Sequence, residues 1–302
     1  MSGRRFDIQA TVAVIAGLVL WTAGPIVIRY LAGFIDLWTQ NMLRYLAACL
    51  FWLPFLLFVI RDGRFERRIF RAALIPAIAN IVMQSLWVGA FYYIEPAFMN
   101  LLAKSSVIWI AGFSMLFFAE ERGLLRSGRF WLGIALSVLG VIGVLVFEEG
   151  FAANRTLTGV VLVFLWSLSW AVYTVTVKIA FKDVDSRVGF SVVSIYTVLG
   201  LCVLGFVFGQ PGRCLEMPKM LWVYIVVSGI LCIAIGHVLY YFSIKRIGAT
   251  IPALVLLASP FTVLAVSGFV FAETLSLVQI LFGLVLLAGA GVSIWAQKHL
   301  GK

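Results

Sequence analysis

Long apolar runs alternate with short polar linkers along the whole chain. A helix of about 20 residues is long enough to cross the roughly 30 Å hydrocarbon core of a bilayer. Ten runs have this length, and each predicts a transmembrane helix. The predicted helices span residues 8–31, 36–60, 69–92, 96–119, 128–147, 156–181, 187–208, 218–242, 250–271 and 276–297.

The fourth and ninth runs carry the same pattern. Both end in Phe-Ala-Glu, at Glu120 and at Glu273, and a glycine-rich run follows each glutamate. Aligning the two glutamates places Ser106 on Ser259. Because the repeat is about 150 residues long, it indicates a duplicated domain rather than a solenoid of short repeats.

The duplication predicts two five-helix domains, residues 1–150 and residues 151–302. Five crossings return the chain to the opposite side, so the second domain enters the membrane upside down. Inverted repeats around a site at mid-depth are a recurring plan of secondary transporters. The predicted fold is therefore an all-α polytopic membrane protein, with ten transmembrane helices arranged as two inverted five-helix repeats around a central cavity.

Composition and charge support a membrane protein. The chain is 63% hydrophobic and only 12% charged, whereas a soluble domain is about 25% charged. The net charge of +10 comes from basic residues in the linkers. If the N-terminus is cytoplasmic, seventeen Lys and Arg lie inside and four outside. This bias predicts two cytoplasmic termini and argues against nucleic acid as a partner.

Four cysteines, Cys49, Cys202, Cys214 and Cys232, show neither a disulfide framework nor metal-ligand spacing. No cofactor and no metal are expected. Arg4 and Arg5 precede the first apolar run, as in a signal peptide, but that run has no small-residue cleavage site. It is interpreted as a retained first helix.

The duplicated Phe-Ala-Glu pattern, with Ser259-Pro260 before its second copy and Trp21 in the first helix, resembles the EamA-type drug/metabolite transporters. The resemblance covers essentially the whole chain and is strongest to bacterial aromatic amino acid exporters. It implies export of small metabolites by alternating access, in a multi-pass protein of the bacterial inner membrane. One departure is Val107, which stands where the second copy has Pro260.

Polar residues at bilayer depth are costly and are therefore candidates for function. Lys104 lies in the fourth run, and Asn100 lies one turn before it. The Lys104 ammonium could attract a substrate carboxylate, or Lys104 could reach the interface as a snorkelling lysine. Asn80 and Gln84 form a second polar stripe, which could contact substrate or bond neighbouring helices.

Arg44 in the second run is predicted to have a structural role. His237 lies in the eighth run with Tyr241 one turn on. A lone histidine there is either a hydrogen-bonded structural residue or a proton-coupling group, since its ordinary pKa is near neutral. No Asp or Glu lies in the middle of any run. Proton-coupled and facilitated transport therefore both stay open.

Several aromatic residues lie deep in the runs. They either pack the core or form stacking walls for a planar apolar group. With Ser169 nearby, such walls suit an aromatic or bulky apolar amino acid better than a sugar phosphate. Ser259 is a further candidate for substrate contact. The deep aromatic candidates for substrate contact are Trp21, Trp109, Trp166, Trp170, Tyr173 and Tyr241.

Glu120 and Glu273 would lie at opposite faces of the membrane. Together with Arg44 and Pro260 they are predicted to act in gating or structure, although each glutamate could simply end a helix and pair with a base. The substrate and the lipid bilayer are the expected partners, and a monomer is compatible with the sequence.

The alternatives within transport are a multidrug exporter for lipophilic compounds and, less favoured, a channel. An enzyme is not expected, because the chain has two histidines and no deep acid. A primary pump is not expected either, because no GxxxxGK[ST] motif occurs.

Overall fold

The computed structural model describes residues 7–117, 126–147, 154–247, 252 and 255–300. Every regular element in these residues is a helix, and none of them forms a strand. The chain is thus all-α, as the apolar runs predict. Glu120 and the predicted domain boundary at residues 150 and 151 lie outside the described residues.

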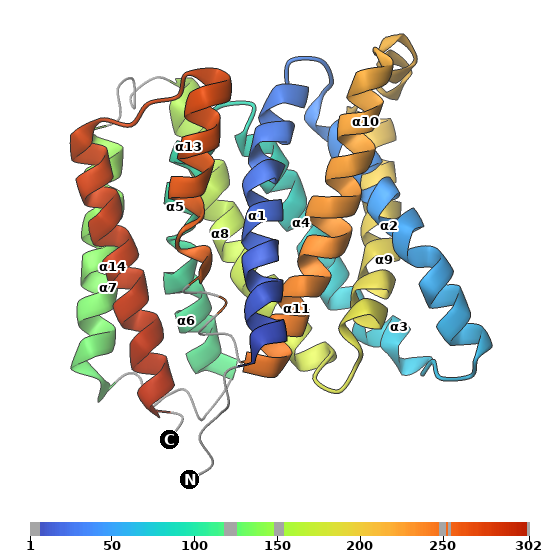
Figure 1. Cartoon of the computed structure of the whole chain (residues 1–302), viewed down its shortest axis with the longest axis horizontal. Coiled ribbons are helices and arrows are strands. Elements are labelled where there is room, and N and C mark those ends of the chain that lie inside the picture. The colour runs from blue at the N-terminus through green and yellow to red at the C-terminus, as the bar shows by residue number, and fades with distance from the viewer. Residues whose placement is uncertain (1–6, 118–125, 148–153, 248–251, 253–254, 301–302) are drawn as a thin grey trace.

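The helices stand side by side, roughly upright, in Figure 1. The first half of the chain forms α1 (Ile8–Leu31), α2 (Leu37–Arg61), α3 (Arg68–Ala72), α4 (Leu74–Ala90), α5 (Pro96–Ala103), α6 (Ser106–Phe117) and α7 (Gly128–Val146). The second half forms α8 (Asn154–Ala180), α9 (Ser186–Phe208), the 3-10 helix η2 (Pro211–Glu216), α10 (Lys219–Ser228), the π-helix η3 (Gly229–Ile235), α11 (Gly236–Ile247), α13 (Ser259–Phe271) and α14 (Leu277–Leu300).

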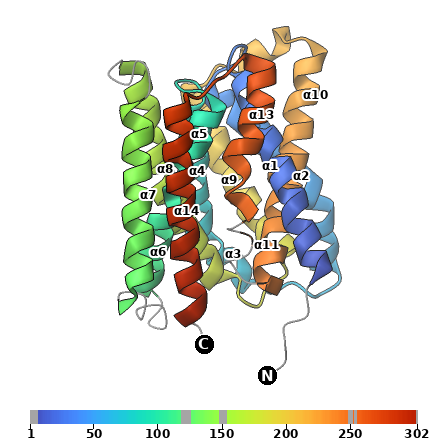
Figure 2. The ribbon, with the colours of Figure 1, turned by 60° about the vertical axis from the view of Figure 1, so that its left-hand side comes forward.

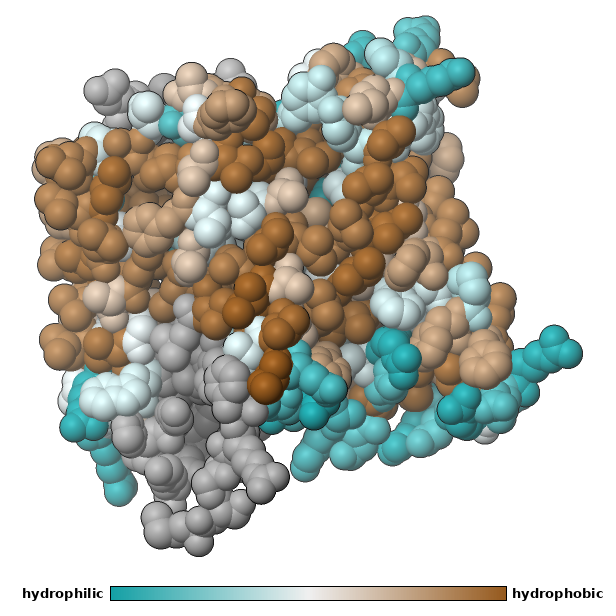
Figure 3. All heavy atoms as spheres, viewed as in Figure 1, coloured by the Kyte–Doolittle hydropathy of each residue, from teal (hydrophilic) through white to brown (hydrophobic). Residues whose placement is uncertain are grey.

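Six helical stretches of the described chain are long and apolar enough to cross a membrane. They are Ile8–Leu31, Leu37–Arg61, Gly128–Val146, Thr156–Ala180, Ser186–Phe208 and Lys219–Ile247. Shorter apolar helices fill the other predicted runs. Hydrophobic side chains form a broad belt across the molecule in Figure 3, with hydrophilic ones gathered toward the ends. The protein is therefore a multi-pass membrane protein, and the exact number of ten crossings stays a prediction.

Four predicted runs are interrupted in the structure, among them the ninth, which has a turn at Leu257 and Ala258. The third is divided at Ala73, and the fourth is divided at Lys104 and Ser105 into α5 and α6. The eighth holds the π-helix η3 between α10 and α11. Hydropathy does not reveal these interruptions, because a broken helix stays as apolar as a continuous one.

Side-chain caps explain where several helices begin. The Asp7 carboxylate accepts a hydrogen bond from the Ala10 N–H at 3.0 Å, before α1. The Asp36 carboxylate accepts from the main chain of Trp38 and Thr39 before α2. Such caps satisfy N–H groups that have no partner within the helix.

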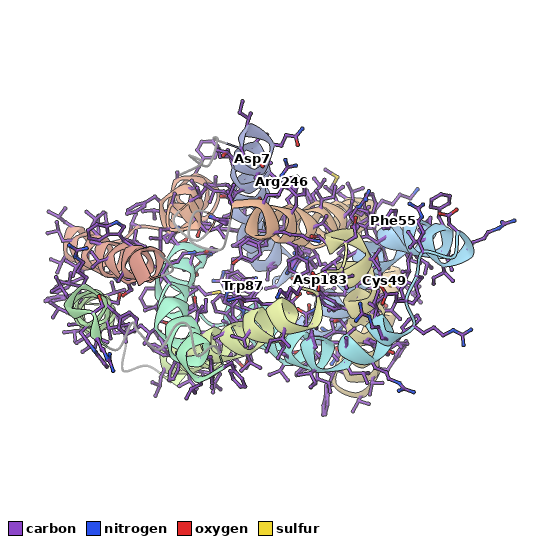
Figure 4. All side chains as sticks on the ribbon, turned by 90° about the horizontal axis from the view of Figure 1, so that it is seen from below. Asp7, Cys49, Phe55, Trp87, Asp183 and Arg246 are labelled. Atoms are coloured by element: carbon purple, nitrogen blue, oxygen red, sulfur yellow. The ribbon has the colours of Figure 1, made fainter. Side chains whose placement is uncertain are left out.

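Two layers of helices face each other across the middle of the bundle. Seen from below in Figure 4, α1, α11 and α13 form one layer, and α4, α6 and α8 form the other. The pairs α1 with α11 and α4 with α8 are in close contact, as are α2 with α9. The first helix of each half thus packs on the third segment of the other half, which is the exchange expected for two copies of one unit.

The two halves run in opposite directions. α1 begins at the end of the bundle drawn lowest in Figure 1, here called the lower end, and α14 ends there too. Arg246, near the end of α11, donates to Asp7 at the start of α1, and Figure 4 shows the two side by side. Lys245 donates to the carbonyl of Val184, just after α8. α8 therefore ends at the level where α1 begins.

The last helices of the two halves, α7 and α14, form a tightly packed pair at one edge, as Figures 1 and 2 show. Glycines allow their main chains to approach closely. A Cβ at Gly140 would lie 2.5 Å from the main-chain nitrogen of Leu286, and a Cβ at Gly289 would lie 2.5 Å from that of Ser137. Small residues are a common means of helix association in membranes.

Candidate functional site: a central aromatic and basic cavity

A cavity of about 1070 Å³, a volume that includes its opening, lies between the two layers. Its lining comes from α1, α2, α4, α5, α6, α8, η3, α11 and α13. Both halves of the chain therefore contribute to one space. Small-molecule sites in helical bundles commonly lie in such a space between the helices.

Aromatic rings form a continuous wall in this cavity. The rings of Trp87 and Trp166 lie 4.6 Å apart, and those of Trp166 and Trp170 stack at 5.7 Å. The rings of Trp170 and Trp21 form a T-shaped pair with centroids 6.3 Å apart, and the ring centroids of Trp21 and Tyr240 lie 5.1 Å apart. Trp87 lies in the interior of the bundle in Figure 4. The wall offers extended π faces to a planar group.

Three basic side chains also line the cavity. Arg44 Nε donates to the Ser228 hydroxyl at 3.0 Å, and the Arg44 side chain is buried. His237 Nδ1 lies 2.9 Å from the carbonyl oxygen of Ile233, whereas its buried Nε2 has no hydrogen-bond partner. Among the described residues, no carboxylate lies within ion-pair distance of Arg44 or Lys104.

The cavity lining contains no acidic residue in the described part of the chain. A site with basic groups and no neutralising acid attracts anions and repels cations. The arrangement can therefore hold a small molecule with an apolar or aromatic body and a negatively charged group.

Eight of the thirteen residues predicted for substrate contact lie at this cavity. Asn100, one of them, is buried, and its amide donates to the carbonyl of Pro96 at 3.1 Å. The sequence assigned Arg44 a structural role, and it lines the cavity as well. The eight are Trp21, Gln84, Asn100, Lys104, Trp166, Trp170, His237 and Ser259.

Three other predicted residues lie outside the cavity lining. Asn80 is fully buried, and its amide donates to the hydroxyls of Tyr45 and Thr197 at 3.1 Å and 3.0 Å, which joins three helices. Trp109 on α6 is 41% exposed. Ser169 donates to a main-chain carbonyl within α8.

The remaining two predicted residues, Tyr173 and Tyr241, are hydrogen-bonded to each other through their hydroxyl groups. Both are buried next to the aromatic wall, and the Tyr173 ring lies 5.9 Å from Trp170. They join α8 to α11 behind the cavity rather than lining it.

Glu273 of the second Phe-Ala-Glu motif caps a helix of the other half. Its carboxylate accepts hydrogen bonds from the main-chain N–H groups of Ala97 and Phe98, at 2.9 Å and 3.0 Å. These N–H groups belong to the first turn of α5, where a negative charge is favourable. Burial raises the pKa of the Glu273 carboxyl, and these donors, together with the Ser267 hydroxyl, act in the opposite direction.

Nearby, Arg29 at the end of α1 pairs with Glu95, which directly precedes α5, and donates to the carbonyl of Phe91 at 2.8 Å. The start of α5 is thus bonded to residues from both halves of the chain. Glu120, the counterpart of Glu273 in the first Phe-Ala-Glu motif, lies outside the described residues. Pro260 is buried in the first turn of α13.

The π-helix η3 borders the cavity and is bonded to two tryptophans. Trp21 Nε1 donates to the carbonyl of Cys232, and Trp52 Nε1 donates to the carbonyl of Ala234, both at 2.9 Å. Short π-helical turns occur frequently at functional sites. His237 lies two residues after the end of this turn.

Sequence reasoning missed Trp87 and Tyr240, both of which line the cavity. Their signal was present, because Trp87 lies three residues after Gln84 and Tyr240 three residues after His237. Residues three apart share one face of a helix. A search three residues after each polar candidate would therefore have found both rings.

Comparison with known proteins agrees with this architecture. The family model for the EamA-like transporter family matches residues 9–146 and again residues 157–295. The chain belongs to the EamA-like transporter family. The two matched regions cover nearly the whole chain, and the family is one of transporters, not of enzymes. No curated protein matches this EamA-like chain in sequence.

The fold also has a solved relative. A crystal structure of a protein superposes on this chain with a TM-score of 0.66, covering 94% of this chain and 96% of the other. The two sequences are 15% identical, so the likeness concerns the fold alone.

Proposed function

We propose that this EamA-like transporter exports small carboxylates with an aromatic or bulky apolar body, with aromatic amino acids as the first candidates. The observation that carries the proposal is the cavity, which combines an aromatic wall with Arg44, Lys104 and His237 and has no acidic residue among its described lining. The stacked indoles suit a planar side chain. The basic groups suit a carboxylate.

Transport would proceed by alternating access across the bacterial inner membrane, with both termini in the cytoplasm. The inverted direction of the two halves supports this mechanism, because equivalent segments can then open opposite ends in turn. The bias of Lys and Arg toward one side of the predicted topology supports the orientation.

Transport in liposomes tests the proposal. Purified protein is reconstituted, the liposomes are loaded with labelled phenylalanine, and efflux is followed with and without a pH gradient. We expect protein-dependent efflux, competed by unlabelled tryptophan, and a large loss in Trp166→Ala. Trp109→Ala is the matched control, because Trp109 lies outside the cavity lining and is 41% exposed.

The same liposomes test the multidrug alternative. If a lipophilic cation such as tetraphenylphosphonium moves and no amino acid does, the proposal is wrong. The basic lining of the cavity argues against that outcome, since a cation would meet Arg44 and Lys104 without a compensating acid.

A further inference from the structure

The fourth and ninth apolar runs are both interrupted at mid-length. In the first half α5 ends at Ala103 and α6 begins at Ser106. In the second half a turn at Leu257 and Ala258 precedes α13, which begins at Ser259. Since the alignment of the two halves places Ser106 on Ser259, the two helices begin at equivalent positions.

The two helices that follow these breaks extend in opposite directions. α6 runs toward the lower end of the bundle and α13 toward the upper end, so both begin near mid-depth (Figure 1). Their first residues, Ser106 and Ser259, both line the central cavity. A helix N-terminus carries about half a positive charge and unpaired N–H groups. Two such ends therefore border the same space.

The side chains at these helix starts have free donors. Ser259 is only 4% exposed, and its hydroxyl oxygen has no hydrogen-bond partner. Lys104, in the break before α6, makes no side-chain hydrogen bond or ion pair with a described residue. A buried donor without a partner is costly, and a bound acceptor would remove that cost.

Packing alone gives a weaker account of Ser259. Its neighbour in sequence, Pro260, explains why α13 begins there, because proline fits the first turn and cannot continue a preceding helix. It does not explain a hydroxyl group that is buried without a partner. Most buried polar side-chain atoms have at least one partner, so Ser259 is an exception that a ligand would resolve.

We propose that the starts of α6 and α13 together form an anion subsite, in which the carboxylate of the substrate lies between the two helix N-termini. The Lys104 ammonium and the Ser259 hydroxyl donate to the carboxylate, and the aromatic wall receives the apolar body. This inference rests on the proposed function and sharpens it. The recognised feature is the negative group, and an amino group on the substrate is not required.

A ligand series on the purified protein tests this subsite. The probes are 3-phenylpropanoate, which has a carboxylate only, phenethylamine, which has an ammonium only, and the neutral 3-phenylpropan-1-ol. Binding is measured by tryptophan fluorescence and by calorimetry. We expect 3-phenylpropanoate to bind at least about 10-fold more tightly than the other two, as charge-assisted hydrogen bonds predict.

Variants test whether the carboxylate of the ligand binds at the starts of α6 and α13. Ser259→Ala should weaken binding of 3-phenylpropanoate about 5- to 10-fold, the effect of one lost hydrogen bond, and leave the alcohol unaffected. Ser169→Ala is the matched control, since Ser169 lies outside the cavity and bonds within its own helix. Lys104→Gln should weaken the binding of 3-phenylpropanoate further than Ser259→Ala does.

Two results would overturn the subsite. One is phenethylamine binding as tightly as 3-phenylpropanoate, and the other is an unchanged affinity for 3-phenylpropanoate in folded Ser259→Ala. The ligand series on the wild-type protein keeps the test valid if a variant does not fold. Carboxylate-selective binding without phenylalanine efflux would contradict the proposed amino acid export but would still support the anion subsite.

Discussion

Two pairs of equivalent helices in this molecule are built in opposite ways. α7 and α14 close on each other through glycines, so that a Cβ at Gly140 would overlap the main chain of α14. α6 and α13 instead begin at breaks beside an open cavity, with serines at their starts. The duplicated unit thus supplies a tightly packed pair, α7 and α14, at the edge. It also supplies a central pair, α6 and α13, at whose starts some polar side chains lack hydrogen-bond partners. Stability and ligand binding are concentrated in different helices.

The tight pair should show the largest response to mutation. Gly140→Val places its Cβ 2.5 Å from the main-chain nitrogen of Leu286, which cannot yield without a shift of α14. We expect a loss of about 3 kcal/mol in unfolding free energy, measured by denaturant or thermal unfolding in detergent. Gly17→Val is the control, because a Cβ at Gly17 meets nothing within 4 Å. Equal losses in both variants would contradict the comparison.

At the central pair, α6 and α13, mutation should reduce transport rather than stability. Lys104→Gln removes the cation at the break before α6, and we expect the rate of phenylalanine efflux to fall about 10- to 100-fold. The unfolding free energy should stay constant or rise, because an unpaired cation in the interior is costly. Lys219→Gln, at an exposed residue that begins α10, should change neither. A Lys104 variant that is unstable but transports normally would argue against this role.

Glu273 joins α5, which precedes the central break, to the other half of the chain. Glu273→Ala removes the acceptor for the N–H groups of Ala97 and Phe98. We expect a loss of about 1–2 kcal/mol, the usual cost of a helix cap, and accelerated hydrogen exchange at the start of α5. Glu216→Ala, at an exposed end of η2, serves as the control. Unchanged exchange at α5 would show that the cap has no role.

The smallest expected effect is on pH dependence. Burial raises the pKa of Glu273 above its ordinary value, so the folded protein binds this proton more tightly than the unfolded chain does. The resulting stabilisation is present below the unfolded-state pKa and is lost as pH rises through the folded-state pKa. Unfolding measured across pH should show this loss in the wild type and not in Glu273→Gln. The opposite slope would mean that the helix N-terminus outweighs burial.

Much of the fold and part of the site follow from local sequence. The apolar runs predict the helices, and the two Phe-Ala-Glu motifs predict the equivalence of Ser106 and Ser259, which both line the cavity. Lys104 stands out because a cation in an apolar run is costly. These features depend on residues close together in sequence, and pattern reasoning can detect them.

Other features depend on contacts that sequence patterns do not encode. The Glu273 cap on α5 joins residues more than 170 positions apart. The interruption at Lys104 has no proline to announce it, because the first half has Val107 where the second has Pro260. For Asn80, the sequence left open whether it contacts substrate or a neighbouring helix, and in the structure it bonds to Tyr45 and Thr197.

The π-helix η3 also affects how α11, the helix that follows it, is rotated about its own axis. A π-turn holds more residues than an α-turn, so converting η3 to an α-helix would shift the register of all that follows by about one residue. One residue of register corresponds to about 100° of rotation about the helix axis. His237 and Tyr240 would then turn away from the cavity together. The indoles of Trp21 and Trp52 donate to carbonyls of this turn and so stabilise the π-helix, which favours the face that α11 presents to the cavity.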